Sequence, residues 1–159
     1  MSSFTITRSA VIQASEAEIY PLISNFHEWT KWSPWETVDP SMARTYSGAE
    51  SGIGAESGIG AKYAWSGKGR AGAGSMEITD ATEPSSVSIR LTFTKPMKAV
   101  NLTRFTLVPD NGGTKVSWTM TGEHKGFGRI VMLFMSMDKL VGRDFEKGLA
   151  SLATAVAAG

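Results

Sequence analysis

The chain of 159 residues contains no cysteine. This absence excludes disulfide bonds, a thiol nucleophile and any metal site built on cysteine. Histidine is scarce as well, since His27 and His124 lie far apart and in no metal-ligand spacing such as HxH or HxxxH. No serine occupies a GxSxG setting, the usual signal of a nucleophile elbow. We therefore expect no metal ion, no cofactor and no catalytic residue of these kinds.

Charge of one sign and long apolar runs are also missing. The 16 basic and 15 acidic residues nearly cancel and form no basic run, so we expect no nucleic-acid partner. The apolar run IVMLFM at 130–135 is far shorter than the roughly 20 residues that span a bilayer, so we expect no stable membrane insertion. Polar and apolar residues alternate over residues 1–14, and this segment lacks the apolar core of a signal peptide. We expect one cytoplasmic domain over residues 1–159, a usual length for a single core.

The central part of the sequence alternates polar and apolar residues with the period of a strand. We expect strands at about 3–12, 42–46, 61–66, 72–82, 86–94, 99–108 and 114–122. One face of each strand is apolar and the other polar, which is typical of an antiparallel sheet covered on one side. Asn111-Gly112 predicts a tight hairpin before the last strand, because Asn-Gly readily adopts positive φ angles.

Two short helices are predicted after the first strand. Ser15 and Glu18 form a capping box that begins the first helix. The second lies within NFHEWTKWSPW, with Phe26, Trp29 and Trp32 turned inward. Both helices therefore offer an apolar side to the predicted sheet.

The last third of the chain changes to helical spacing. Apolar residues recur every three to four positions over 137–156, and a helical turn or short helix is expected before them at 127–136. Gly142 and Gly148 interrupt this pattern at a cost of about 1 kcal/mol each, which suggests close packing against the sheet. We expect an α+β fold in which a curved antiparallel sheet of about seven strands wraps around one long C-terminal helix.

Two glycine-rich segments resemble phosphate-binding loops by their letters alone. The hexapeptide ESGIGA occupies residues 50–55 and returns unchanged at 56–61, while Gly67, Gly69 and Gly72 match GxGxxG. A phosphate cradle needs a helix to begin directly after the loop, and here each segment leads into a strand pattern. We interpret the first segment as a duplicated, lengthened hairpin loop and the second as an ordinary hairpin loop.

Four stretches carry a resemblance to a known family. They are IxASxAEIYPLISNF at 12–26, WSPW at 32–35, GxMEIT at 74–79 and MDKLVGRDFEKGLxxL at 137–152. With the order of elements, they resemble the helix-grip fold of the START and birch-pollen-allergen superfamily, in its SRPBCC or polyketide cyclase/dehydrase-like branch. This resemblance implies a hydrophobic small molecule, lipid or polyketide-like, held between sheet and helix. It implies no particular reaction, since fold alone does not give function.

The candidate ligand-binding residues are those that alternation directs toward the helix, together with a few polar groups. They are Trp35, Tyr46, Tyr63, Trp65, Met76, Phe93, Asn101, Phe105, Trp118, Met120, His124 and Met135. Aromatic rings and flexible methionines suit a pocket for an apolar ligand of variable shape. Tyr46 and Asn101 are the expected polar contributors, and the resemblance places His124 near the cavity mouth.

Three alternatives remain open on the sequence. Each apolar candidate is also explained as ordinary core. The chain is alternatively a polyketide cyclase, hydratase or dehydratase, in which a pocket positions the substrate near Tyr46, Asn101 and His124. It is alternatively a protein-interaction module, for which a sizeable exposed apolar patch is expected and the protein partner is unknown.

Overall fold

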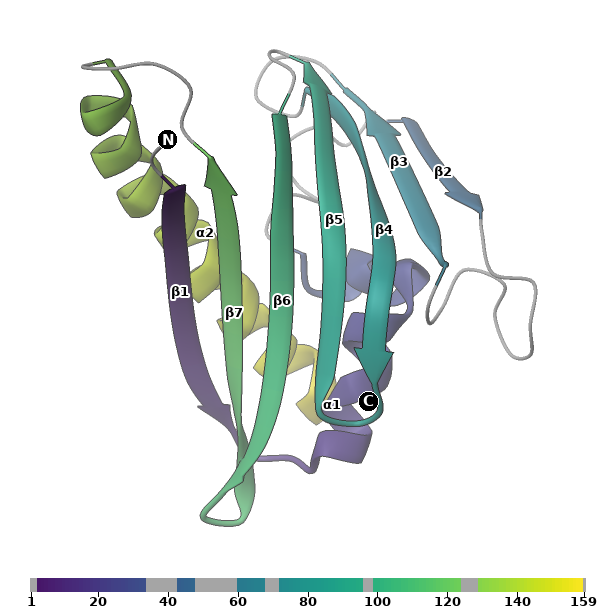
Figure 1. Cartoon of the computed structure of the whole chain (residues 1–159). Helices are drawn as coiled ribbons and strands as arrows, with labels where there is room; N and C mark the ends of the chain where they lie inside the picture. The colour runs from purple at the N-terminus through teal and green to yellow at the C-terminus, as the bar shows by residue number, and fades with distance from the viewer. Residues whose placement is uncertain are drawn as a thin grey trace.

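The computed structural model describes residues 3–33, 43–47, 60–67, 72–95, 99–123 and 129–158. Seven strands and three helical segments occur in these ranges (Figure 1). In chain order they are β1 (Ser3–Ile12), α1 (Glu16–Ser24), the 3-10 helix η1 (Phe26–Lys31), β2 (Ala43–Ser47), β3 (Lys62–Ser66), β4 (Ala73–Thr82), β5 (Ser86–Lys95), β6 (Ala99–Asp110), β7 (Gly113–Glu123) and α2 (Arg129–Ala158). The predicted order of elements along the chain and the predicted fold class are confirmed.

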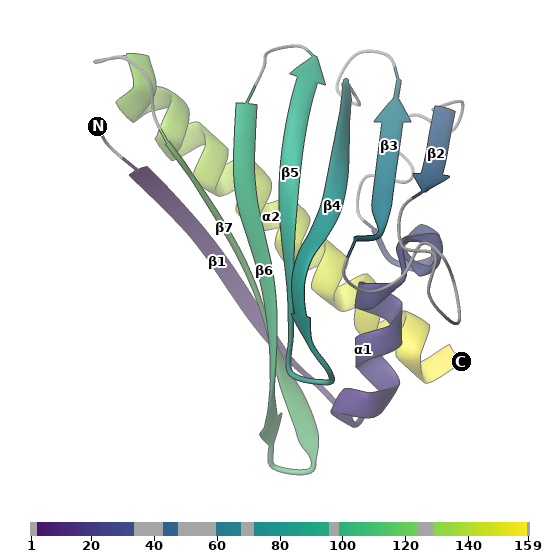
Figure 2. The same ribbon diagram turned by 45° about the vertical axis from the view of Figure 1, so that its right-hand side comes forward.

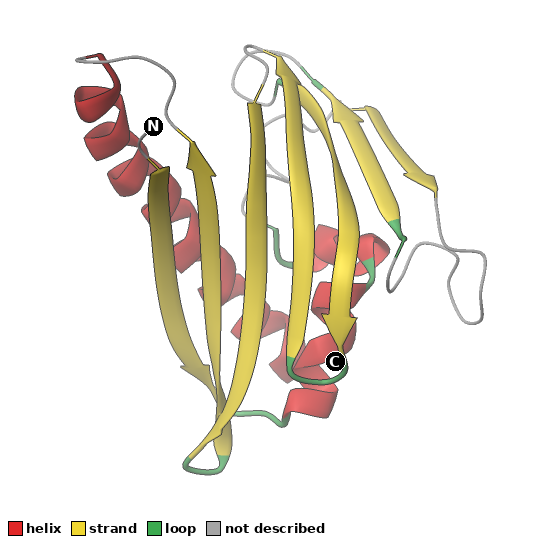
Figure 3. Cartoon of the chain, viewed as in Figure 1, coloured by secondary structure: helices red, strands yellow, loops and turns green. Residues whose placement is uncertain are grey.

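All seven strands form one antiparallel sheet in the order β1-β7-β6-β5-β4-β3-β2. The helices lie on one side of this sheet, and α2 crosses behind it diagonally (Figures 2 and 3). We call the side that faces the helices the inner face. The other side, which we call the outer face, carries the polar residues of the alternating strands. They include the hydroxyl pairs Thr7–Thr119 and Ser9–Ser117 between β1 and β7.

The hairpin and capping predictions are confirmed in detail. Asn111 and Gly112 have φ angles of 47° and 84° and join Asp110 to Gly113 across a two-residue turn. The Ser15 hydroxyl accepts a hydrogen bond from the Glu18 backbone N–H at 3.2 Å. The local sequence therefore sets both the turn between β6 and β7 and the start of α1.

The glycine-rich loops connect neighbouring antiparallel strands, as expected. The segment with the GxGxxG letters joins β3 to β4, and the Gly67 N–H donates to the Gly72 carbonyl at 2.7 Å. The ESGIGA repeat joins β2 to β3, which pair from Ser47–Lys62 onward, but most of the repeat lies outside the described residues. No helix follows either loop.

The C-terminal helix is longer than predicted. The sequence suggested a separate turn or short helix at 127–136, whereas α2 runs without a break over 30 residues from Arg129. The segment from Arg129 to Val141 contains neither proline nor glycine, so no residue in it interrupts the helical hydrogen bonds. The helix therefore continues through the predicted boundary.

Two glycines mark the closest approaches in the fold. A Cβ on Gly142 of α2 would meet the guanidinium of Arg8, which crosses the helix there and pairs with Glu146 at 2.9 Å. A Cβ on Gly74 of β4 would meet the Thr92 backbone carbonyl, and the Trp65 ring at 2.7 Å. The prediction that Gly142 allows close packing against the sheet is confirmed.

These two glycines should respond differently to the same substitution. Gly142→Ala displaces only the end of a flexible arginine and gains helix propensity, so we expect unfolding free energy within about 1 kcal/mol of wild type. Gly74→Ala meets a backbone carbonyl and should lose about 1–3 kcal/mol. Urea denaturation of both variants measures the difference, and equal effects would contradict this account of the two contacts.

The buried phenol of Tyr20 on α1 gives a prediction for alkaline pH. Burial, and secondarily the charge of Glu83, raise the pKa of Tyr20 above its usual value of 10.0. Above about pH 10 the unfolded chain releases this proton while the folded chain retains it, so stability should fall as pH rises further. Tyr20→Phe should show a shallower decline between pH 9 and 11 in urea denaturation. Parallel curves for the two proteins would show that Tyr20 does not contribute.

Candidate ligand-binding site

One end of the inner face is filled by an aromatic cluster. Trp29 of η1 and Trp32, which directly follows η1, pack against Phe105 and Trp118 of the sheet. Phe145 of α2 stacks on Trp118 with ring centroids 4.1 Å apart. All five side chains are at most 3% exposed. We call this region the packed end; its sheet residues, Phe105 and Trp118, lie near the middle of β6 and β7.

The indole N–H groups of the cluster also fix the helices. Trp29 Nε1 donates to the Ile23 carbonyl and Trp32 Nε1 to the Leu22 carbonyl, both at 2.8 Å. These carbonyls belong to the last turn of α1, where no further intrahelical donor is available. The two tryptophans therefore end α1 and hold η1 against it.

The opposite end of the same face is less completely covered. Trp65, Met76, Leu91 and Phe93 are half-buried, whereas Ile78 and Ile89, two positions further along β4 and β5, are 0% and 1% exposed. The register brings the four together, because Gly74 pairs with both Trp65 and Phe93, and Met76 with Leu91. The Trp65 and Phe93 rings meet edge to face at 5.8 Å. We call this region the open end; it lies toward the start of β6.

The edge of the open end carries a row of rings. Tyr46 of β2 stacks on His27 of η1 with ring centroids 3.8 Å apart, and its other neighbour is Tyr63 of β3 at 5.2 Å. Tyr63 is buried and also contacts Phe26. Tyr46 therefore links the open end to η1 rather than projecting alone into the interior.

Two buried polar side chains of the inner face lie on β6. Asn101 and Thr103 are 9% and 6% exposed, and they are flanked by Leu91 of β5 and Met120 of β7 respectively. The prediction that Asn101 faces inward is confirmed by its burial and its phase with Phe105. Leu91 and Thr103 were not among the predicted site residues, although the same alternation would have included them.

The structure thus divides the predicted site residues into three groups. Phe105 and Trp118 lie at the packed end. The open end and its borders contain Tyr46, Tyr63, Trp65, Met76, Phe93, Asn101 and Met120. Trp35 and His124 lie outside the described residues, and of Met135 only its place in the backbone of α2 is described.

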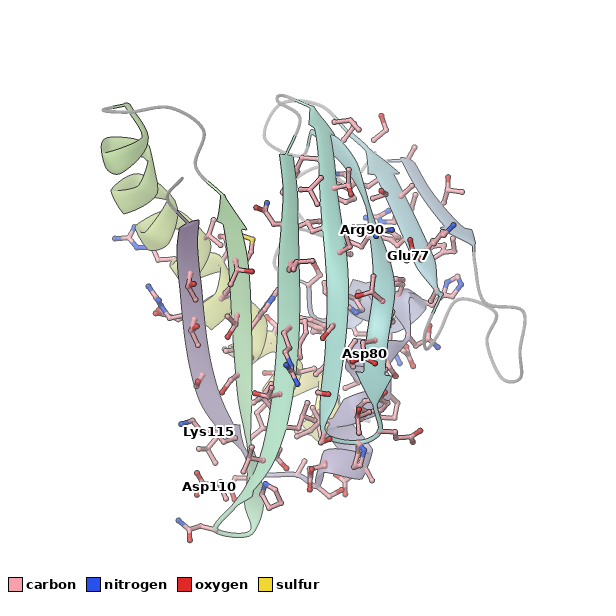
Figure 4. The ribbon with its side chains drawn as sticks, in the orientation of Figure 1. Glu77, Asp80, Arg90, Asp110 and Lys115 are labelled. Atoms are coloured by element: carbon pink, nitrogen blue, oxygen red, sulfur yellow. The ribbon has the colours of Figure 1, made fainter. Side chains whose placement is uncertain are left out.

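A separate depression lies over β3 and β4. It has a volume of about 240 Å³ and is lined by Lys62, Tyr63, Ala64, Ser75, Met76 and Glu77. Glu77 also pairs with Arg90 at 2.7 Å on the outer face, where Figure 4 shows the two side chains next to each other. Three of its six lining residues, Lys62, Ser75 and Glu77, are polar, so it is not the apolar site that the sequence predicts.

The described residues offer neither a metal-binding cluster nor a membrane-spanning helix. No three histidine, aspartate or glutamate side chains gather there in a way that could hold a metal ion. None of the helices in those ranges combines the length and apolar character that a bilayer span requires.

The architecture defines a helix-grip protein, in which a seven-stranded antiparallel sheet curves around a long C-terminal helix. A family model described as polyketide cyclase/dehydrase and lipid transport matches residues 3–157. The chain belongs to this family, and the resemblance drawn from the sequence is confirmed. No curated protein is similar enough in sequence to match.

Solved structures confirm the fold. A protein from Rhizobium leguminosarum has a TM-score of 0.69 at 13% identity, with 99% of this chain and 97% of that chain covered. Ara h 8.0201 has a TM-score of 0.64 at 12% identity, with coverage of 99% and 100%. The Aha1 dimer from Colwellia psychrerythraea has a TM-score of 0.62 at 18% identity, with 96% of each chain covered. At these identities the likeness concerns the fold alone.

The two ends of the inner face should differ in their tolerance of truncation. Phe145→Ala removes a ring from a closely packed cluster and should cost about 3–5 kcal/mol of unfolding free energy. Phe93→Ala acts at the half-buried end, where no closed cavity is left, and should cost at least about 1 kcal/mol less. Urea denaturation of both variants provides the test. An equal or larger loss for Phe93→Ala would mean that the open end is ordinary core.

Proposed function

We propose that the protein binds a hydrophobic or aromatic small molecule, lipid-like or polyketide-like, between the open end of the sheet and α2. The observation that carries the proposal is the change in exposure along one continuous apolar face. At the packed end the side chains are covered, whereas Trp65, Met76 and Phe93 remain half-buried. Folding alone gains most when such side chains are fully buried, and a ligand would complete that burial.

The chemistry of the open end supports an apolar ligand of variable shape. Its rings and its methionine provide large contact area, and a thioether side chain adapts easily to different surfaces. Trp65 lies across Gly74 and against Phe93, so its plane is fixed from two sides. Phe105 and Trp118 are covered at the packed end and support the site from there, while Trp35, His124 and Met135 stay predicted contacts.

The family and the fold are equally consistent with a cyclase-like role. The enzyme hypothesis expected Tyr46 and Asn101 to reach a common point. They belong to β2 and β6, which are separated by three strands, or about 19 Å along the sheet. Tyr46 is also stacked on His27. This separation favours binding over acid–base chemistry by that pair.

The interaction-module hypothesis expected a sizeable exposed apolar patch. The large exposed apolar residues of the described chain are Val11, Val100, Leu102 and Val108. Val100 and Leu102 lie near one end of β6 and Val108 near the other, with the exposed Arg104 between them. A divided set of this kind supports the interaction hypothesis less than the ligand hypothesis.

Binding can be tested with N-phenyl-1-naphthylamine, oleate and naringenin. We expect saturable binding of at least one of them near one molecule per chain, measured by probe fluorescence and native mass spectrometry. Trp65→Ala should weaken that binding by about tenfold, because a ring contact of this size contributes on the order of 1–3 kcal/mol.

Val100→Ala is the matched control, since Val100 is 59% exposed on the polar face of the sheet. It should leave the dissociation constant unchanged. Thermal melting of each variant shows whether it is folded. The proposal is wrong if none of the three compounds binds the wild-type protein, or if folded Trp65→Ala binds as tightly as wild type.

A further inference from the structure

The Asn101 carboxamide and the Thr103 hydroxyl are buried on an apolar face without visible structural use. Within the described part of the chain, neither side chain makes a hydrogen bond. The residues are 9% and 6% exposed, and their polar atoms are not among the fully buried side-chain atoms that lack a partner, so a neighbouring molecule can reach them. By contrast, the buried Thr114 hydroxyl on the same face donates to the Ala14 carbonyl at 2.7 Å. We therefore expect Asn101 and Thr103 to have a hydrogen-bond partner that is not part of the described chain.

The pairing between β6 and β7 ends beside Asn101. Pairing between β6 and β7 ends at Leu102–Thr121, although β6 begins at Ala99 and β7 continues to Glu123. The two strands diverge at this end, as Figure 1 shows. The next step of the register would place Gly122 opposite Asn101, and glycine has no side chain to cover the carboxamide. The carboxamide is thus covered least on its β7 side.

The apolar surroundings of the pair belong to the open end. Leu91 pairs with Asn101, and Met76 pairs with Leu91 on the next strand. Met120 pairs with Thr103. A molecule lying against Met76, Leu91 and Met120 would therefore bring one of its edges to Asn101 and Thr103.

We propose that Asn101, supported by Thr103, is the polar anchor of the ligand and hydrogen-bonds an uncharged oxygen group, a ketone, phenol or alcohol. This inference rests on the proposed binding function. A carboxamide donates and accepts, so it pairs with either a carbonyl or a hydroxyl oxygen. Together, the apolar surface and this anchor select an oxygenated hydrophobe over a plain hydrocarbon.

A negatively charged ligand fits this position poorly. Among the inner-face residues whose side chains the structure describes, the cations are Arg8 and Arg44. Arg8 on β1 is paired with Glu146, and Arg44 lies on β2, about 19 Å from β6 along the sheet. A carboxylate at Asn101 would lose its hydration without an opposite charge among these described side chains, which is unfavourable. The anchor should therefore prefer a neutral oxygen to a carboxylate.

The test compares naphthalene, 2-naphthol and 2-naphthoate, which share one ring system. Their dissociation constants are measured at pH 7 by isothermal titration calorimetry. We expect wild type to bind 2-naphthol about five- to tenfold more tightly than naphthalene. This ratio corresponds to the contribution of about one hydrogen bond. We also expect 2-naphthol to bind more tightly than 2-naphthoate.

Asn101→Leu keeps a similar branched shape without polar atoms and should reduce the preference for 2-naphthol over naphthalene to about twofold or less. Naphthalene should bind this variant at least as tightly as wild type. Thr103→Val should reduce the preference partly. The matched controls are Leu102→Ala and Thr121→Val, on the outer face of the same strand pair, and both should retain it.

The outcomes separate this inference from the proposed function. If none of the three naphthalenes and none of the three earlier compounds binds wild type, the proposed function itself fails. If the naphthalenes bind but Asn101→Leu keeps the wild-type preference, the anchor is wrong while apolar binding stands. Tightest binding of 2-naphthoate would also overturn the anchor. Thermal melting shows whether Asn101→Leu is folded.

Discussion

Two indole hydrogen bonds determine how the interior of this protein is divided. Trp29 and Trp32 donate to the carbonyls of Ile23 and Leu22, which α1 leaves without donors at its end. The bonds hold both rings at the junction of α1 and η1 and direct them toward the sheet. There they meet Phe105 and Trp118 and fill the space beneath α2. The packed end is therefore a consequence of how one short helix ends.

The remainder of the interior follows from that arrangement. The rings of η1 reach Phe105 and Trp118, and α2 adds Phe145 on the other side of Trp118. Trp65, Met76, Leu91 and Phe93 are left half-buried further along the sheet. One sheet thus serves two purposes: its packed end stabilises the fold, and its open end offers apolar surface that a small molecule can cover.

Much of this architecture could be predicted because it is encoded locally. The alternation of polar and apolar residues predicted the strands. The Asn-Gly pair predicted the hairpin, and Ser15 predicted the start of α1. The division into two ends could not be predicted in this way. Phe93 and Phe105 alternate alike and both face the helices, but only Phe105 is covered by tryptophans from a distant part of the chain. Alternation identifies the face of a side chain and carries no information about what lies opposite it.

The same limit applies to polar residues, and it explains why the anchor needs a structure to be recognised. Thr114 and Thr103 lie on neighbouring strands, and both occupy inward positions in the alternating pattern. The sequence alone therefore does not distinguish them. Only the coordinates show that Thr114 bonds Ala14 near the strand start, whereas Thr103 and Asn101 have no such bond among the described residues. The satisfied group lies toward the packed end and the other two toward the open end. Both polar groups lie beside the half-buried apolar surface, where a ligand that carries its own oxygen would supply their hydrogen-bond partner.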